Sequence, residues 1–418
     1  MSDLKKLLKR EPKLSSKGDY LQLPYSNLGQ WKLNIWKSYL FHFFMGLHFI
    51  SGVLLPFFMT WGKLSFIEVM FLQSYFTIMI LLLEIPCGAI ADYLSRKLSL
   101  ILGAISTAFA ALIYGIYPHI SIFIIGETLW AFGAALTSGS DQALIYDTLK
   151  KLGQENKISK IIARNRSFML FGICISAPVG SIISTYLSLN LVMTFMVIPF
   201  FLATLISITL KEPMKEKITK KSGGYLRIIK DGLNQLKKNK ILRLLALEMI
   251  ITESMVFFLI WTYQLYLEAL HVQLMFYGFI SAFMTITQII FNNIVPSLEN
   301  RITNKRRLLQ VFSIIPGIGF ITMSLIYFIP LSIPLILITI GFGFSRSIIF
   351  IKGINNQIET ENRATVISTI SMMANLIRTI LYPLVGYMAM WNLSYGLISL
   401  GIVIILATIF SRIKSEYL

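Results

Sequence analysis

Residues 88–97, with the sequence Gly-Ala-Ile-Ala-Asp-Tyr-Leu-Ser-Arg-Lys, separate two long apolar runs at 66–91 and 98–117. Each run has about the 20 residues that a helix needs to cross a bilayer. A short segment that carries an acid, an arginine and a lysine between two such runs predicts a tight loop at a membrane surface. An ordinary basic loop without a special role is the alternative.

The residue types in this loop suit such a position. Gly88 permits a close approach of two helices. Asp92 lies near the start of the second apolar run, where the N-terminus of a helix favours an anion. Arg96 and Lys97 reach lipid headgroups or grip the end of a helix. These residues therefore anchor the predicted loop at the membrane surface.

The composition indicates that the whole chain is a membrane protein. Of its 418 residues, 55% are hydrophobic and 14% are charged, and the mean hydropathy is +0.70. One soluble core of this length does not bury that much apolar surface. The net charge of +18 lies in short segments between apolar runs, so an anionic membrane surface explains it better than nucleic acid does. Cys87 and Cys174 lie within apolar runs and are expected to pack as small residues.

Motifs of enzymes and nucleotide-binding proteins are absent from the sequence. It has no Walker loop, no zinc-type spacing of Cys and His, and no G-x-S-x-G elbow. We therefore expect no enzyme activity and no cofactor, and a proton gradient as the energy source.

Twelve apolar runs predict an all-α membrane protein with twelve transmembrane helices. Lys63 is the only Lys or Arg in the connections that follow odd-numbered spans, whereas the other connections are rich in basic residues. Basic residues mark the cytoplasmic side, so we expect both tails, 1–33 and 412–418, in the cytoplasm and the spans in the cell membrane. The predicted spans are 34–60, 66–91, 98–117, 120–146, 164–187, 190–210, 241–267, 273–296, 308–328, 331–354, 363–389 and 392–411.

The longest connection, 211–240, divides the spans into two halves, 34–210 and 241–411. It carries ten Lys or Arg residues. Its second half repeats apolar residues at helical spacing, which predicts a basic amphipathic helix on the anionic inner leaflet. A solvated linker is the alternative. The apolar residues are Leu226, Ile229, Leu233 and Leu236.

The spacing G-x-x-x-D-x-x-x-R-K in residues 88–97 resembles a signature of the major facilitator superfamily, G-x-x-x-D-R-x-G-R-R between the second and third spans. Tyr93 and Ser95 depart from it, where the family often has a basic residue and a glycine. The plan of six spans, a basic linker and six spans is also similar to that family. The resemblance covers 34–411 and implies two pseudo-symmetric six-helix bundles that alternately open a central site to either side.

Two further segments, 138–147 and Arg363-Ala-Thr, resemble a bacterial and archaeal branch often described as drug-efflux-like. Residues 172–180 partly resemble the glycine and proline motif of superfamily antiporters. Ala177 replaces the glycine before Pro178, and the alternative is an ordinary helix kink. The branch implies export of a small amphipathic solute by a protein expected to act as a monomer.

Charged side chains inside predicted spans are costly, at roughly 2.5–3.5 kcal/mol each near the bilayer centre, and so they mark candidate sites. A carboxyl group held away from water can take up and release a proton near neutral pH. Glu127 and Glu253, and Glu84 in second place, are therefore candidates for proton coupling. The alternative is a permanent ion pair of Glu253 with Arg378 or Arg346.

The resemblance implies that spans one, four, seven and ten line the central cavity, beside spans two, five, eight and eleven. Glu127, Glu253, Arg346 and Arg378 would then face one aqueous cavity. The two arginines would bind an anionic group of the substrate or hold the acids ionised. Polar or aromatic residues on the same helices complete the candidate cavity: Asp141, Trp130, Gln264 and Asn375.

Two further ideas concern residues closer to the inner side. His42 and His48 could relay protons, although a membrane histidine more often hydrogen-bonds to a neighbouring helix. The resemblance implies a gating role for Gly88, Asp92, Arg96 and Lys97. Arg96 with Asp147 would form part of an interdomain latch that holds the outward-facing state; charge that only orients the chain is the alternative. No nucleic-acid partner is expected, and a symporter for an organic anion or a non-transporting receptor remain as other functions.

Overall fold

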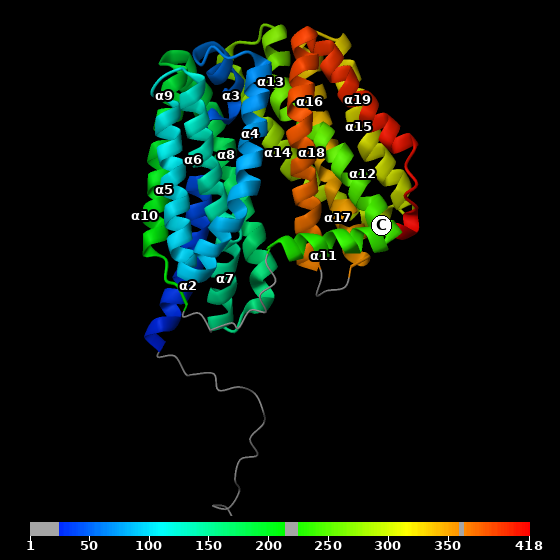
Figure 1. Ribbon diagram of the computed structural model, residues 1–418. Helices are drawn as coiled ribbons and strands as arrows, with labels where there is room; N and C mark the ends of the chain where they lie inside the picture. The colour runs from blue at the N-terminus through cyan, green and yellow to red at the C-terminus, as the bar shows by residue number, and fades with distance from the viewer. Residues whose placement is uncertain (1–24, 214–224, 359–362) are drawn as a thin grey trace, which may run out of the picture.

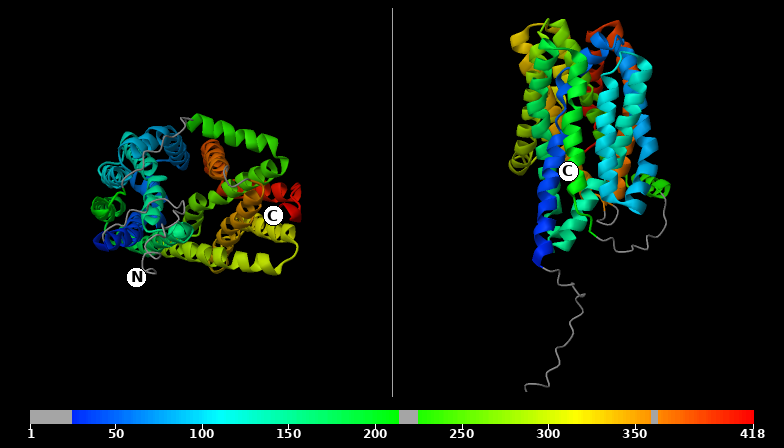
Figure 2. Two further views of the ribbon diagram at one scale, coloured as in Figure 1. Left: turned by 90° about the horizontal axis from the view of Figure 1, so that it is seen from below. Right: turned by 90° about the vertical axis from the view of Figure 1, so that its left-hand side faces the viewer.

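The computed structural model describes residues 25–213, 225–358 and 363–418. These residues form helices, with no strand among them, in two bundles that stand side by side (Figure 1). The all-α prediction is therefore confirmed. The view from below shows the ends of the helices of both bundles (Figure 2).

The amino-terminal bundle contains the first six predicted spans, several of them built from two helical segments. They are α2 (Tyr25–Met45) with η1 (Phe49–Gly52), α3 (Leu54–Pro56) and η2 (Phe57–Trp61); α4 (Phe66–Ala89) with η3 (Ile90–Leu94); α5 (Arg96–Tyr114); α6 (Ile120–Thr137) with α7 (Ser140–Lys151); η4 (Glu155–Lys157) with α8 (Ile158–Tyr186); and α9 (Leu189–Phe195) with α10 (Val197–Thr209).

The carboxy-terminal bundle repeats this plan after the linker helix α11 (Tyr225–Lys238). Its first and fourth spans are again divided into two helices. The elements are α12 (Lys240–Phe257) with α13 (Leu259–Ala269), α14 (Leu274–Arg301), α15 (Lys305–Leu325), α16 (Ile329–Ser345) with α17 (Ser347–Asn356), α18 (Arg363–Trp391), and α19 (Leu393–Ile409) followed by η6 (Ser415–Tyr417).

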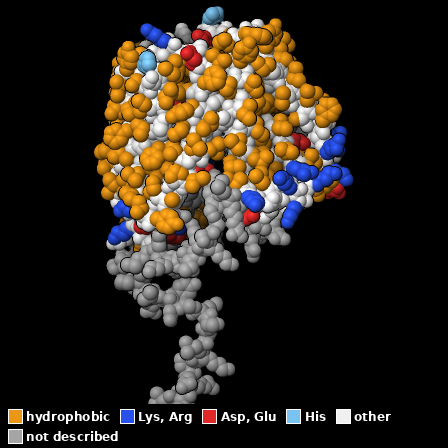
Figure 3. Space-filling model, viewed as in Figure 1, with side chains coloured by type: hydrophobic (Ala, Val, Ile, Leu, Met, Phe, Trp, Pro, Cys, Tyr) orange, Lys and Arg blue, Asp and Glu red, His pale blue; other side chains and the backbone are white. Residues whose placement is uncertain are grey.

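The lengths of these elements agree with a twelve-span protein. In the described part of the chain, ten helices are long and apolar enough to cross a membrane, and α19 is a shorter apolar helix. The interrupted first span completes twelve. Hydrophobic side chains cover most of the face in view, with most of the visible basic side chains near the lower edge (Figure 3). Following the charge-based orientation, we call this lower side the inner side and the opposite side the outer side.

The first span is interrupted after α2, where the prediction had one continuous helix. A Cβ atom on Gly46 would lie 2.3 Å from the carbonyl oxygen of Met169 in α8. A Cβ atom on Gly172 would likewise lie 2.6 Å from the carbonyl oxygen of Phe43. The glycines therefore allow the two backbones to touch at the place where α2 ends.

The tight loop predicted for residues 88–97 is wrong in its geometry. The apolar residues after Gly88 continue the helix, and η3 ends only one residue before α5 begins. Ser95 alone is extended between them, and its hydroxyl oxygen accepts a hydrogen bond from the Leu98 N–H at 3.0 Å. No atom lies within 4 Å of a Cβ built on Gly88, so Gly88 makes no close helix approach here.

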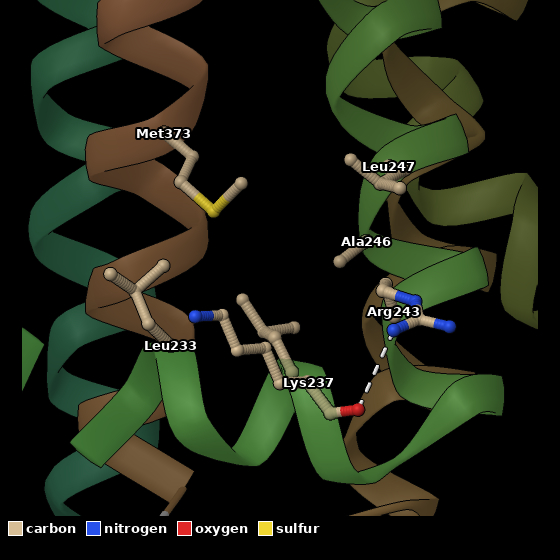
Figure 4. Close-up of a pocket in the computed structure, with 7 residues that line it drawn as sticks. Leu233, Lys237, Arg243, Ala246, Leu247 and Met373 are labelled. Carbon is tan, nitrogen blue, oxygen red and sulfur yellow. Dashed lines mark hydrogen bonds between the residues drawn. The ribbon is translucent and has the colours of Figure 1, made fainter. Parts of the chain in front are cut away.

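The helix predicted within the linker is present as α11, and it lies across the inner end of the carboxy-terminal bundle (Figure 1). A Cβ atom on Gly232 would meet the Thr369 side chain of α18, and Leu236 is buried. Residues 214–224 of the linker are outside the described residues. A small pocket of about 180 Å³ lies where α11, α12 and α18 meet, with Lys237 and Arg243 among its mainly apolar lining (Figure 4).

Candidate transport site between the bundles

The outer halves of the two bundles are joined by hydrogen bonds through Gln264 of α13. Its side-chain oxygen accepts from the Leu55 N–H at 2.9 Å, and its amide nitrogen donates to the Ser51 carbonyl at 3.3 Å. The Tyr263 hydroxyl donates to the same carbonyl at 3.4 Å. Gln264 is only 3% exposed. The prediction that Gln264 lines an open cavity is therefore wrong for this conformation: it belongs to the closed outer side, because it satisfies backbone groups of the broken first span.

Two helix pairs extend this closure. Between α4 and α18, the Ser74 hydroxyl donates to the Thr379 carbonyl at 2.8 Å. Between α8 and α14, the Ser181 hydroxyl donates to the Met275 carbonyl at 2.8 Å. Below these contacts the ribbons of the bundles diverge, and the space-filling view shows a hollow between them (Figures 1 and 3). The arrangement is closed on the outer side and open on the inner side.

An ion pair of α12 and α18 lies at the inner edge of the closed layer. The Arg378 Nη2 atom is 3.6 Å from Glu253 Oε1, and its guanidinium lies 4.6 Å from the centre of the Phe257 ring. Asn375 accepts a long hydrogen bond from Arg378 Nη1 at 3.5 Å. The side chains of Arg378 and Glu253 are 17% and 24% exposed. Arg378 lies one residue before Thr379 on α18, so this pair is next to the contact between Ser74 and the Thr379 carbonyl.

The alternative pairing of Glu253 with Arg346 does not form. Arg346 is 1% exposed and donates from Nη1 to the Ser313 hydroxyl of α15 at 3.0 Å. It lies inside the carboxy-terminal bundle at the joint between α16 and α17. The prediction that Arg346 faces a shared cavity is therefore wrong for this conformation. The guanidinium group of Arg346 points to Ser313 of α15.

Glu127 is also buried within one bundle, at 4% exposure. The Gln73 amide of α4 donates to its Oε1 atom at 2.9 Å, and the Tyr114 hydroxyl of α5 lies close to the same carboxyl group. Glu127 does not open to the inner side in this conformation. Glu84, the third candidate for proton coupling, is partly exposed on α4, 11 residues inward of Gln73, or about 16 Å along a helix.

The two candidate cavity residues of span four, Trp130 and Asp141, lie on different helices. Gly139, with φ of +74°, separates α6 from α7, a left-handed conformation that suits glycine. Trp130 stays on α6, where its ring packs edge-on against the rings of His48 and Phe200. Asp141 falls on α7 and contacts His42. Trp130 and Asp141 therefore have different neighbours, and neither lies beside the Glu253–Arg378 pair.

The gating residues form a charge network at the inner end of the amino-terminal bundle. Arg96 forms an ion pair with Asp147 and donates from Nη1 to the Ala143 carbonyl at 2.9 Å. Glu212 accepts from the Arg96 N–H at 2.7 Å. The contact predicted between Arg96 and Asp147 exists, but it joins α5 to α7 within one bundle. The interdomain latch is therefore not what this pair forms here.

The rest of the gating loop adds little to this network. Lys97 is partly exposed next to Arg96. The backbone of Asp92 lies in η3, and its side chain is outside the described residues. Among the described side chains of the gating residues, those of Arg96 and Asp147 form an ion pair.

We expect the Arg96–Asp147 pair to stabilise the amino-terminal bundle. Arg96→Ala and Asp147→Asn should each lower the thermal unfolding temperature in detergent, and the double variant should lose less than the sum of the two. For a partly buried contact pair, the coupling free energy should be about 0.5–3 kcal/mol. Additive losses would show that the pair contributes no direct stabilisation.

Sequence reasoning missed two buried acids in the carboxy-terminal bundle. Glu248 accepts a hydrogen bond from the Ser411 hydroxyl at 2.6 Å. Glu299 lies 2.6 Å from the Lys352 amine and 3.7 Å from the Lys305 amine. The only sequence signal was an acid near the inner end of a span, which also describes exposed surface acids. Both contacts lie near the inner end of the carboxy-terminal bundle.

The comparisons with known proteins can be set beside this geometry. Residues 38–353 match the Major Facilitator Superfamily. The chain belongs to this superfamily. It is therefore a membrane transporter and not an enzyme. No curated protein matches the chain.

Several solved transporters of the superfamily have a similar fold. A variant of the nucleoside transporter NupG aligns with a TM-score of 0.77 at 15% identity, over 92% of this chain and 100% of that one. A D-xylose-proton symporter aligns with a TM-score of 0.72 at 13% identity, over 94% and 100%. An inward-facing, unoccupied bacterial homologue of the human lysosomal transporter Spinster has a TM-score of 0.68 at 14% identity, over 94% and 97%. At these identities the likeness shows the fold alone.

Proposed function

We propose that this chain is a proton-coupled secondary transporter that exports a small amphipathic solute across the cell membrane, as a monomer with both termini in the cytoplasm. The observation that carries the proposal is the Glu253–Arg378 pair over Phe257. It offers both charges and an aromatic face next to the closed outer layer. A solute with an apolar body and a polar group suits such a wall.

Glu127 is our candidate for the coupled proton. Its carboxyl group is removed from water and bonded to Gln73 within the amino-terminal bundle. A buried carboxyl group is stable only when it is neutral or well paired. Taking up a proton and losing it would therefore change the packing of α6 against α4, which is the helix that carries the closing contact at Ser74.

Export is supported by the segment around Pro178. Gly172 contacts the backbone of α2, and a Cβ on Gly180 would lie 1.7 Å from the Phe49 carbonyl oxygen. Such tight packing beside a proline bend is what the antiporter motif is expected to give. Uptake of an organic anion with protons is the second candidate. It is favoured by the buried Nε atom of Arg378, which has no hydrogen-bond partner among the described residues. One protein of similar fold is a D-xylose-proton symporter.

The proposal predicts flux that follows a proton gradient in proteoliposomes. Glu127→Gln keeps the size and the hydrogen-bonding capacity of the side chain but removes its proton chemistry. We expect this variant still to exchange solute between the inside and the outside of the proteoliposomes. Its accumulation of solute driven by a proton gradient should fall at least about tenfold. Gradient-driven flux unchanged in Glu127→Gln would remove Glu127 from the mechanism.

A screen of candidate solutes with imposed gradients of either direction separates the two candidates. Accumulation of cationic or neutral amphipathic compounds in the direction opposite to proton flow supports export. Accumulation of an organic anion with the gradient supports symport. No gradient-dependent flux of any tested compound would contradict both.

A further inference from the structure

His42 and Asp141 form a close contact between the first and fourth spans. The His42 Nε2 atom lies 3.1 Å from Asp141 Oδ2, and its Nδ1 atom lies 2.8 Å from the Ser38 carbonyl oxygen. The two side chains are 14% and 20% exposed. The sequence suggested a role for each residue separately and did not pair them.

The hydrogen-bonding capacity of the ring determines what this geometry requires. The Ser38 carbonyl can only accept, so Nδ1 must carry a hydrogen. An ionised Asp141 carboxylate can also only accept, so Nε2 must carry a hydrogen as well. A neutral imidazole has one N–H and cannot serve both. With both contacts formed as hydrogen bonds, the pair holds one proton more than a neutral ring and an ionised carboxylate, either on the ring or on the Asp141 carboxyl group.

The position of Asp141 favours the proton on the ring. Asp141 is the second residue of α7, and the N-terminus of a helix stabilises a negative charge. The pair is then an imidazolium bound to a carboxylate. If the proton leaves, the ring must give up one of its two hydrogen bonds.

Other charges around the pair are already engaged or exposed. The helices packed against α2 are α7, α8 and α10. On α2 itself, Lys37 donates to the Thr209 carbonyl at 2.6 Å. On α7, Asp147 pairs with Arg96, which lies on α5. α10 has no titratable side chain. The remaining titratable residues of α2, α7 and α8 are Tyr25, Lys32, Tyr39, Tyr146, Lys150, Lys151, Lys160, Arg164, Arg166, Cys174 and Tyr186.

We propose that the His42–Asp141 pair is a proton-binding site that joins α2 to α7 and opens to the inner side. Proton loss would release the inner segment of the first span from the fourth, one turn before the break at Gly46. The proposal deepens the proposed function, because it adds a second proton site to Glu127. It also stands on hydrogen bonds that can be examined without any transport.

The test is nitrogen NMR of the full chain labelled only on histidine, in lipid nanodiscs at pH 7. The chain has four histidines, so the signals of His42 are assigned by their loss in His42→Gln. We expect two protonated ring nitrogens in His42, and a neutral ring with a bare Nε2 in Asp141→Asn. A neutral ring beside a protonated Asp141, seen as a carboxyl infrared band that Asp141→Asn removes, also supports the site. A neutral ring with an ionised Asp141 would overturn it.

His48→Gln is the matched control, because His48 packs among the rings of Trp130 and Phe200 and does not face an acid there. It should leave the His42 signals unchanged. In flux assays without a gradient, His42→Gln and Asp141→Asn should flatten the dependence of solute flux on pH to within about twofold. If the spectra show the additional proton but the two variants keep the normal dependence of solute flux on pH, the proton-binding site exists and its role in coupling is wrong. If no tested compound shows gradient-dependent flux in the unaltered protein, the proposed function fails instead.

Discussion

Arg378→Ala is expected to reduce solute flux at least about tenfold and to destabilise the protein, because it leaves Glu253 without its cation. An unpaired charge at membrane depth costs roughly 2.5–3.5 kcal/mol. The double variant Glu253→Gln with Arg378→Gln removes both charges, so it should recover most of the stability. It should not recover flux if the pair contacts the solute.

This comparison separates transport from folding. Thermal unfolding in detergent reports stability, and flux in proteoliposomes reports function, for the same purified variants. Arg307→Ala is the control, because Arg307 is exposed at the inner end of α15 and its loss should change neither quantity. A double variant with normal flux would show that the Glu253–Arg378 pair only neutralises charge within the bundle.

Gly278→Leu is expected to abolish transport by preventing closure of the outer side. A Cβ atom at Gly278 would lie 2.0 Å from the Ala177 carbonyl oxygen and 2.5 Å from Ser181 Oγ. It also approaches Gly52, whose own Cβ would lie 2.5 Å from the Gly278 Cα atom. A leucine cannot fit between these backbones, so the outer halves must separate.

The expected separation can be read by chemical labelling. A Ser51→Cys reporter, in a chain whose Cys87 and Cys174 are replaced, should be slow to react with a membrane-impermeant thiol reagent from outside. Gly278→Leu should raise its reaction rate at least about tenfold. Gly29→Leu is the control, because no atom lies within 4 Å of a Cβ at Gly29. Equal labelling rates in both variants would contradict the assigned role of Gly278.

The spans were predictable because each needs its own apolar length, whatever its neighbours are. The amphipathic linker helix was predictable for the same reason, since its apolar spacing is local. Asn375 was rightly placed on the helix of Arg378, and it contacts that residue. These features depend on one helix at a time.

Contacts between side chains of different helices were harder to predict, because they depend on how each helix is rotated about its axis and on where a span is interrupted. Arg346 and Arg378 both lie near the middle of a span, yet one turns into its bundle and the other toward the opening. A break at Gly139 separates Asp141 from the helix of Trp130, and Asp141 contacts His42. The twisting of a span at a glycine or at a joint cannot be read from its hydropathy. The candidate site was therefore identified by residue type, and its pairs were found only in three dimensions.

The central claim is that two rigid bundles alternate around the hollow that Glu253 and Arg378 border. Two distances measured by electron spin resonance test it: an inner pair of labels at Lys151 and Arg307, and an outer pair at Tyr117 and Tyr327, in a chain without native cysteines. As transported solute and a proton gradient are added, the inner distance should shorten while the outer distance lengthens. Distances that change in the same direction, or that stay fixed while solute is transported, would contradict the account.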